Sequence, residues 1–321
     1  MKKFRWLFLV VVVALFGVGV LFTQAESIEV LKADCEILEQ DGDPWIVPGR
    51  ELKGYCGTQG SQPGRRTGSF KEARHDNFDS LDPVYWDKLD TTFDCNQAVF
   101  SPQNVMEYPE GGFGLQMSAV EGAEKSYLSA SIATKEANDA QFTYGRFEIV
   151  LKPPKISGVL TAFFLYRFDP WQEIDVEFVG KDTTKLLVNV YYNPGKEGDL
   201  YNYGYRGTPV LIDLGFDASE DFHEYAMEWE QDEIRWFVDG NLVHVRSHGR
   251  PTPIPHLPMR LHINTWPNCS EELAGPMDAS ALPVRAEVRS VSISNWYPPP
   301  LTRLERFFDA TDWRDDAAWI Q

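Results

Sequence analysis

The sequence predicts an all-β fold, a sandwich or jelly roll built from short antiparallel strands. Between residues 76 and 296, short runs rich in β-branched and aromatic residues recur, separated by Gly, Pro, Asn or Asp. Helical periodicity is nearly absent from the same stretch. Its length of about 220 residues is usual for one domain of this kind.

The first residues predict a targeting segment. Lys2, Lys3 and Arg5 form a positively charged start, and an apolar run follows over residues 6–22. Small residues at 23–25 suit cleavage by a signal peptidase. The apolar run is also at the lower length limit for spanning a bilayer. Residues 1–25 are therefore expected to be a signal peptide or an uncleaved membrane anchor, and the protein to be secreted, periplasmic or tethered outside the cytoplasm.

Residues 26–73 are rich in Gly, Pro and charge, and are interpreted as an N-terminal extension with little regular structure. A catalytic domain is expected over 74–297. Three prolines open the C-terminal tail, residues 298–321, and should end the last strand. A short helix is expected after them.

The runs that predict strands are most distinct in the middle of the chain. The turn residues Asp239-Gly240-Asn241 between two of them indicate a hairpin. The runs lie at residues 144–151, 158–166, 173–179, 186–192, 224–230, 234–238, 242–246 and 259–264.

The formal net charge of -18 restricts the partners of the protein. Nucleic acids and anionic lipids would be repelled, whereas a neutral polysaccharide carries no such penalty. We expect a polysaccharide partner, no nucleic acid, membrane contact only through an uncleaved N-terminal segment, and a monomer.

Four cysteines, Cys35, Cys56, Cys95 and Cys269, permit three disulfide connectivities in an exported protein. Cys35 with Cys56 is favoured, because both lie in the same extension. The cysteines and the six histidines are scattered, so a zinc site is not expected.

A row of acidic residues carries the functional prediction. If residues 171–178 form a strand, Glu173, Asp175 and Glu177 face one side and the apolar residues between them face the other. Like charges at successive positions on one face destabilise an ordinary sheet. A solvated strand face and a metal site are alternatives, but a straight strand surrounds an ion poorly and no further ligand cluster is evident.

Catalysis by paired carboxylates fits the row best. Retaining glycosidases hold two carboxyl groups about 5–5.5 Å apart, one as nucleophile and one as proton donor. The Cα atoms of Glu173 and Glu177 are expected to lie roughly 13 Å apart, so their side chains must lean toward each other on a curved sheet. Asp175 between them should raise the pKa of the glutamate that stays protonated.

These residues resemble glycoside hydrolase family 16 and, within it, the bacterial lichenases, which are endo-1,3-1,4-β-glucanases. The pattern Glu-x-Asp-x-Glu has the lichenase spacing, without the residue that laminarinases insert before the last glutamate. The resemblance spans roughly residues 76–296. It includes residues 144–148, 179–185, 214–219, 222–225, 228–229 and 235–240.

The resemblance implies a jelly roll of two curved antiparallel sheets, like that of concanavalin A, with an open substrate cleft on the concave face. It implies that Glu173 is the nucleophile, that Glu177 is the general acid and base, and that Asp175 holds and tunes both. No cofactor is required. Many relatives carry a structural calcium, but ligands for one are not matched in this sequence.

The resemblance and the strand alternation also indicate residues that bind substrate. Trp171 is expected near the cleavage point, and Trp266 as a platform under a sugar ring. Asn189, Tyr191 and Asn193 alternate toward the same face as the carboxylates and are expected to line the cleft.

Three features depart from the lichenases. Cys95 resembles one of their paired cysteines, yet the expected partner region, residues 127–131, has none. That region also lacks the aromatic and arginine residues that lichenases place near the donor subsites. Residues 267–269 differ from the usual Asn-Gly.

A structural role is expected for His223, which belongs to the family pattern. For His262, two positions are open: it faces the cleft or, as is favoured, it is a buried, hydrogen-bonded imidazole. The function predicted is a retaining endo-β-glucanase, with a mixed-linkage 1,3-1,4 glucan as the favoured substrate. The alternatives are a transglycosylase or an exopolysaccharide depolymerase with the same site and, less favoured, a non-catalytic glycan-binding protein.

Overall fold

The structure is a computed structural model that describes residues 68–121, 125–135, 141–193, 208–247 and 253–300. Nearly all regular structure in these residues is β-strand, which confirms the predicted all-β class. The exceptions are α1 (Glu271–Ala274), η1 (Pro102–Asn104) and η2 (Ala279–Ala281). In the described part of the chain, no helix is long and apolar enough to span a membrane. The predicted targeting segment, C-terminal helix and Cys35–Cys56 pair lie outside it.

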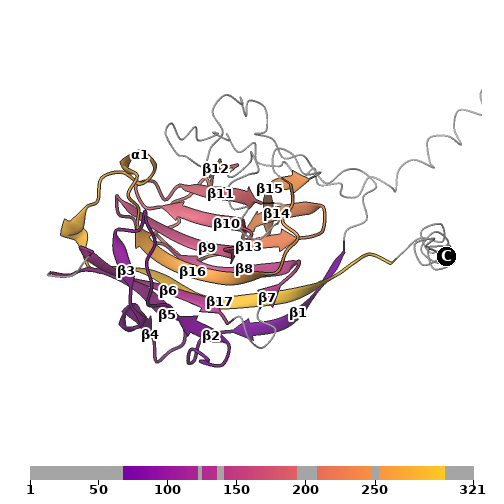
Figure 1. Cartoon of the computed structure of the whole chain (residues 1–321), viewed down its shortest axis with the longest axis horizontal. Helices are drawn as coiled ribbons and strands as arrows, with labels where there is room; N and C mark the ends of the chain where they lie inside the picture. Colours follow the sequence, from indigo (N-terminus) through magenta and orange to yellow (C-terminus); the bar gives the residue numbers. More distant parts are fainter. Residues whose placement is uncertain (1–67, 122–124, 136–140, 194–207, 248–252, 301–321) are drawn as a thin grey trace, which may run out of the picture. The chain divides into compact units, whose positions relative to one another are not determined.

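The first layer, which we call sheet A, has the central strand order β12, β11, β10, β9, β16 (Figure 1). Beyond β16 lie β6 and β7, and β2 pairs with β6. Its strands are β2 (Trp86–Lys88), β6 (Tyr127–Thr134), β7 (Gln141–Phe142), β9 (Val159–Arg167), β10 (Gln172–Val179), β11 (Lys185–Tyr192), β12 (Val210–Asp213) and β16 (Met259–Pro267).

The second layer, sheet B, has the central order β15, β14, β13, β8, β17. Beyond β17 lie β1 and β5, and β4 pairs with β5. Its strands are β1 (Ser69–Asp76), β4 (Val105–Glu107), β5 (Phe113–Ala119), β8 (Gly145–Lys152), β13 (His223–Trp229), β14 (Glu233–Val238), β15 (Asn241–Ser247) and β17 (Val284–Tyr297).

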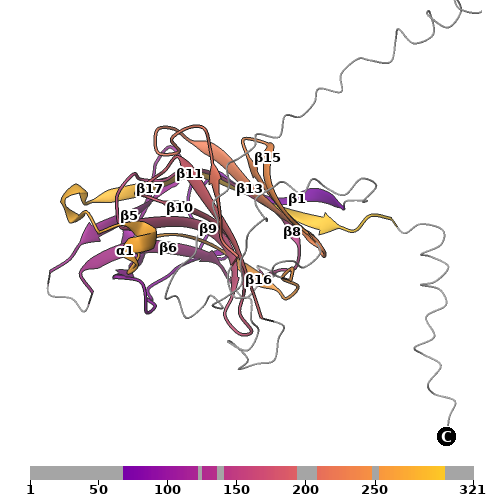
Figure 2. The ribbon, with the colours of Figure 1, turned by 90° about the horizontal axis from the view of Figure 1, so that it is seen from above.

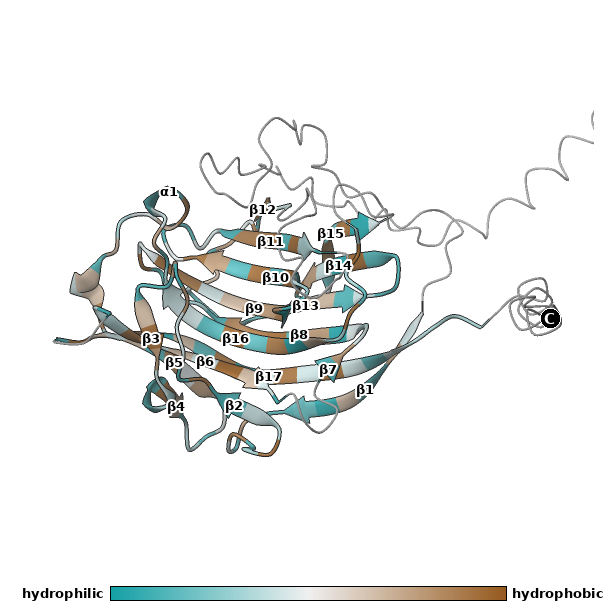
Figure 3. Cartoon of the chain, viewed as in Figure 1, coloured by the Kyte–Doolittle hydropathy of each residue, from teal (hydrophilic) through white to brown (hydrophobic). Residues whose placement is uncertain are grey.

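The two sheets are joined where β5 pairs with β6, and β3 (Ala98–Phe100) adds to β6 as a parallel strand. The two sheets face each other (Figure 2), and the apolar side chains of the core lie between them. Phe178 of sheet A, for example, meets Tyr225 of sheet B with ring centroids 4.7 Å apart. Apolar and polar residues alternate along the strands, as Figure 3 shows, so each sheet has one face in the core.

Each predicted run in the middle of the chain corresponds to a strand, β8 to β11 and β13 to β16, with ends that agree within three residues. The predicted hairpin joins β14 to β15, and Asp239 and Gly240 both have positive φ, 47° and 75°. Two left-handed residues form the turn that matches the twist of paired strands. The sheets begin at Ser69, within the segment 26–73 assigned to the extension.

Candidate active site

Strand β10 separates its residues between two environments. Ile174, Val176 and Phe178 face the core and are 0–1% exposed. Glu173 and Glu177 are partly buried on the opposite side, and Asp175 between them is 3% exposed. We call this side of sheet A the carboxylate face. Because β10 has a paired strand on each side, it holds its side chains in fixed register.

All three carboxyl groups have raised pKa values. Burial is the main cause, and it raises the pKa of Glu173 to about 8 and that of Glu177 to about 7. Burial and the charges of both glutamates raise the pKa of Asp175 well above its usual range. The side-chain hydrogen bond between Asp175 and Glu173 raises the pKa of Asp175 and lowers that of Glu173. The proton of this bond therefore lies on Asp175.

Trp171 supplies a second donor to the same glutamate. Its Nε1 donates to Glu173 Oε2 over 2.7 Å, and this bond lowers the pKa of Glu173. The indole ring stacks on Tyr191, with centroids 4.6 Å apart and planes inclined by 16°. Glu177 has no such donor in the described part of the chain, and burial accounts for its shift. The pKa of Glu173 is thus raised by burial although two hydrogen bonds lower it, whereas that of Glu177 is raised by burial alone.

Gln172 anchors the start of β10 from the core side. Its fully buried side chain accepts hydrogen bonds from the backbone N–H groups of His256 (2.8 Å) and Leu257 (3.0 Å). Its Nε2 donates to the backbone oxygen of Asn193 over 2.9 Å. The stretch that carries Trp171 and Glu173 is therefore tied to two loops. From sheet B, Trp236 Nε1 donates to the backbone oxygen of Asp175 over 3.0 Å.

The strands beside β10 place aromatic side chains on the carboxylate face. On β9, Tyr166 pairs with Glu173 and Phe164 pairs with Asp175, and both rings are partly buried. Sequence analysis missed these two residues, because their run is apolar at nearly every position. Only the strand register shows which of them share a side with the carboxylates.

The predicted substrate residues of β11 lie at the carboxylate face. Tyr191 pairs with Glu173 and is partly buried, whereas Asn189 pairs with Asp175 and is 5% exposed. Asn189 Oδ1 accepts from the backbone N–H groups of Val190 (2.9 Å) and Thr208 (2.7 Å). Asn193 lies just beyond the strand and is 3% exposed.

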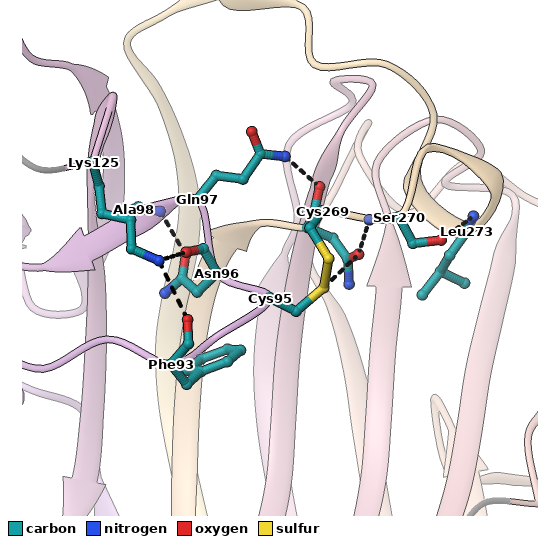
Figure 4. The surroundings of a disulfide bond; sticks show 10 residues. Phe93, Cys95, Asn96, Gln97, Ala98, Lys125, Cys269, Ser270 and Leu273 are labelled. Carbon is teal, nitrogen blue, oxygen red and sulfur yellow. Dashed lines mark hydrogen bonds between the residues drawn. A yellow bond between two sulfur atoms is a disulfide. The ribbon is translucent and has the colours of Figure 1, made fainter. Parts of the chain in front are cut away.

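Trp266 lies on the same face, where it pairs with Leu160 of β9 and is partly buried. Phe93, 43% exposed, meets it edge to face with ring centroids 4.9 Å apart. The loop that carries Phe93 is joined to the chain after β16 by the disulfide Cys95–Cys269 (Figure 4). The aromatic pair is therefore fixed by a covalent link.

The cysteine that pairs with Cys95 lies at a different position from the one that the resemblance implies. The lichenase resemblance points to β6, but Cys269 follows β16 instead. Because β6 and β16 pair directly, both positions lie close to this loop. Gln97 Nε2 also donates to the backbone oxygen of Asn268 over 2.7 Å, and Lys125 Nζ to that of Asn96 over 2.5 Å.

The expectation of a hydrogen-bonded His262 is wrong. This residue is 9% exposed on the carboxylate face, pairs with Phe164, and its buried Nε2 has no hydrogen-bond partner. His223 lies on sheet B, where it contacts Asp239 Oδ2 over 2.7 Å and stacks on Phe216. Among the described residues, no three His, Cys, Asp or Glu side chains are arranged to hold a metal ion.

The carboxylate face thus combines three carboxyl groups with raised pKa values, hydrogen-bond donors to Glu173 and a band of partly buried aromatic rings. A carboxylate nucleophile with a nearby carboxylic acid can perform substitution at an acetal carbon with protonation of the leaving oxygen. Aromatic rings beside such a pair suit the apolar faces of sugars. An arrangement of this kind can support the cleavage of a glycosidic bond.

A family model, curated relatives and solved structures all point to the same group of proteins. Residues 93–279 match the model of "Glycosyl hydrolases family 16". A β-glucanase of Brevibacillus brevis is 33% identical over 221 residues, which cover 66% of this chain and 78% of that protein. A β-glucanase of Bacillus amyloliquefaciens is 32% identical over 217 residues, 66% and 81% of the two chains. The crystal structure of a lichenase from a mouse hindgut metagenome is 30% identical with a TM-score of 0.60, over 70% of this chain and 99% of that one.

Proposed function

The chain belongs to glycosyl hydrolases family 16 and is a glycoside hydrolase, and from this premise we propose that it is a retaining endo-β-glucanase. Glu173 is the nucleophile, Glu177 the general acid and base, and Asp175 the residue that holds Glu173 in place. The observation that carries the proposal is that Glu173 accepts side-chain hydrogen bonds, whereas Glu177 accepts none in the described part of the chain. Hydrogen bonds from Trp171 and Asp175 lower the pKa of Glu173, whereas burial raises the pKa of Glu177 with no such donor to oppose it.

In the proposed reaction, Glu173 starts as the carboxylate and Glu177 as the carboxylic acid. A Glu173 oxygen attacks the anomeric carbon while Glu177 gives its proton to the glycosidic oxygen, so the carbon–oxygen bond breaks and the leaving sugar departs neutral. Glu177, now ionised, takes a proton from water as that water attacks the same carbon and displaces Glu173. Asp175 keeps its proton throughout and donates a hydrogen bond to Glu173.

A mixed-linkage β-glucan is the proposed substrate. The relatives named above are β-glucanases and a lichenase. The Glu-x-Asp-x-Glu motif also resembles that of lichenases, because no residue is inserted before its last glutamate. A neutral polymer also suits a chain with a net charge of -18. We further propose that the protein is exported through residues 1–25, which N-terminal sequencing of the mature protein tests.

The first test is hydrolysis of mixed-linkage β-glucan, laminarin, xyloglucan and cellulose, followed by reducing ends and product length. We expect short oligomers from mixed-linkage glucan and at least a 1,000-fold loss of kcat in Glu173→Gln. If the folded protein leaves every polymer intact, the β-glucanase proposal is wrong. Products longer than the substrate would identify a transglycosylase instead.

Azide distinguishes the roles of the two glutamates. In Glu177→Ala, the glycosyl intermediate on Glu173 still forms from a substrate with a good leaving group, and azide then displaces it to give a β-glycosyl azide. In Glu173→Ala, azide attacks the substrate directly and gives the α-product. Reversed stereochemistry in the two variants would show that the assignment is the wrong way round.

A further inference from the structure

Gln172, the first residue of β10, is a fully buried amide that bonds three backbone groups. Its Oε1 accepts from the N–H groups of His256 (2.8 Å) and Leu257 (3.0 Å). Its Nε2 donates to the oxygen of Asn193 over 2.9 Å. An ionised glutamate at this position could not donate, and a methionine could neither donate nor accept at these distances. The set of bonds therefore requires an amide.

The loop that Gln172 contacts is held by both sheets. Trp229 of sheet B, fully buried on β13, donates from Nε1 to the backbone oxygen of Pro255 over 2.8 Å. Arg167, at the end of β9 in sheet A, donates to the backbone oxygen of Pro258 over 3.3 Å. The two residues between these prolines are those whose N–H groups Gln172 accepts. The start of β10 is thus tied to a loop that is itself anchored.

Two aromatic rings beside Glu173 are close in the chain to the groups that Gln172 bonds. Trp171 lies in the turn before β10, next to Gln172. Tyr191 lies near the end of β11, shortly before Asn193. The two rings stack with centroids 4.6 Å apart, and the indole Nε1 donates to Glu173 Oε2 over 2.7 Å. A bond this short and directional depends on where the start of β10 and the end of β11 are held.

We propose that Gln172 is a positioning residue for the reaction, which holds Trp171 where its indole N–H reaches Glu173. It does so by keeping the start of β10, the end of β11 and the anchored loop together. Its amide lies on the core side of β10, opposite Glu173, so it touches no reacting atom and acts through Trp171. This inference rests on the proposed function, in which Glu173 is the nucleophile, and adds a residue that controls how that group is held.

Loss of the amide should weaken the bond between Trp171 and Glu173. That bond lowers the pKa of Glu173, because the indole N–H stabilises the ionised carboxylate. A less well placed indole therefore raises this pKa, and the acidic limb of the kcat/KM profile moves to higher pH. An amide that only supports the fold would lower Tm when removed and leave the limb in place. Tm and the pH profile measured together therefore separate the two roles.

The variants are Gln172→Met, which has the same length without the amide, and Gln172→Asn, whose amide is on a side chain one methylene shorter. We expect each to move the acidic limb up by about 0.3–1 pH unit, because the bond to Glu173 is weakened and not removed. Asn104→Leu is the matched control, since the Asn104 amide is also buried and donates to the backbone oxygen of Gln116 over 3.0 Å. It should lower Tm and leave the acidic limb in place.

A double-mutant cycle with Trp171→Phe tests the route of the effect. If Gln172 acts through the indole N–H, Gln172→Met should not move the acidic limb further in the Trp171→Phe background. An equal shift in both backgrounds overturns the proposal. An unchanged limb in folded Gln172→Met and Gln172→Asn overturns it as well.

The indole resonance of Trp171 gives a readout that does not depend on glucan cleavage. It is identified in a proton–nitrogen correlation spectrum by its absence from Trp171→Phe. Because this N–H contacts Glu173, its chemical shift should follow the ionisation of that group. We expect the midpoint of the titration to rise in Gln172→Met as the acidic limb does. If the enzyme cuts no glucan, a raised midpoint still supports the role of Gln172 in holding Trp171, and an unchanged midpoint overturns it.

Discussion

Glu173 differs from the other two carboxyl groups in the donors that reach it. It accepts hydrogen bonds from Trp171 Nε1 and from the protonated Asp175, whereas burial alone shifts the pKa of Glu177. Trp171 was predicted as a substrate residue from its place before the motif. The structure adds a hydrogen bond to Glu173, the proposed nucleophile, so Trp171 also lowers the pKa of that carboxyl group.

Replacement of Trp171 by phenylalanine tests this role. The ring remains, but the N–H that stabilises the Glu173 carboxylate is lost, so the pKa of Glu173 rises further. We expect the acidic limb of the kcat/KM profile to move up by about one pH unit, since a charge-assisted hydrogen bond contributes about 1.5–3 kcal/mol. A pH–rate profile on the cleaved glucan measures the shift.

Trp266→Phe is the comparison, because Trp266 contacts Phe93 and not the carboxylates. It should change KM and leave the acidic limb in place. An unchanged acidic limb in Trp171→Phe would show that the indole N–H does not control the ionisation of Glu173.

The raised pKa of Glu177 also affects stability. The folded protein binds this proton more tightly than the unfolded chain, so the contribution of Glu177 to the free energy of unfolding is full below about pH 4.5. It is lost as pH rises through 7. Glu177→Gln removes the titrating group. We expect the variant to be up to about 3 kcal/mol more stable than the original at pH 8 and equal to it at pH 4.

Urea unfolding at the two pH values measures this difference. Surface Glu271→Gln, at the start of α1, serves as the control and should show no comparable pH-dependent gain. Equal stability of Glu177→Gln and the original at pH 8 would contradict the raised pKa.

The proposed reacting groups could be chosen from the sequence because a strand with three acidic residues on one side is itself unusual. It did not indicate Phe164 or Tyr166, nor that His262 Nε2 has no hydrogen-bond partner, because these features depend on which strands are neighbours. The Asn189 amide is a similar case, since its contact with Thr208 joins residues 19 positions apart.

At the scale of elements, strands with β-branched or aromatic residues were predicted well and others were not. Strand β6 is built largely from Ser and Ala, and both of its faces are buried, so it has neither the composition nor the alternation of a typical strand. It acquires its structure by pairing with β16 and β2. A sequence pattern reports the side chains of one strand, but it does not show which neighbouring strands can pair with its backbone.

The disulfide joins two elements that carry the ring pair of Phe93 and Trp266. It links positions 174 residues apart, for which chain entropy predicts up to about 5 kcal/mol of stabilisation. We expect Cys95→Ser/Cys269→Ser to lose about 2–4 kcal/mol in urea unfolding and to raise KM, because Phe93 is less firmly held against Trp266.

A double-mutant cycle with Phe93→Ala tests the route of this effect. If the disulfide acts on KM through Phe93, its removal should have no further effect on KM in the Phe93→Ala background. Full additivity of the two changes in KM would contradict that route.

On sheet B, a buried ionic cluster joins β13 to β14. Arg235, 7% exposed, contacts Glu228 (2.7 Å), Glu233 (2.6 Å) and Glu230. Arg235→Met removes the cation that joins these acids, although Glu228 keeps its ion pair with Arg146, so we expect a loss of about 3–5 kcal/mol in stability. Arg235→Lys keeps the charge without the fork geometry and should lose less. Equal losses in the two variants would show that shape, not charge, dominates.

At the scale of the whole molecule, the net charge of -18 should make the protein bind neutral polysaccharides in preference to anionic ones. We expect turnover of neutral glucan to change less than about twofold between 0.02 and 0.5 M salt, because no ion pairs with substrate are involved. Binding of an anionic polysaccharide should be weak at low salt and increase as salt screens the repulsion. Rates and native-gel mobilities at both ionic strengths test this, and tight binding of the anionic polymer at low salt would contradict it.

The pairing of β1 with β17 brings the two ends of the folded domain together. Ser69 is the register partner of Tyr297, so the chain enters and leaves at neighbouring positions on one edge of sheet B (Figure 1). A short glycine-rich linker between these positions can close the chain into a ring, and the exposed turn at Asp239 and Gly240 can then be opened. The domain is therefore suited to circular permutation, with new ends on the sheet opposite the catalytic strand.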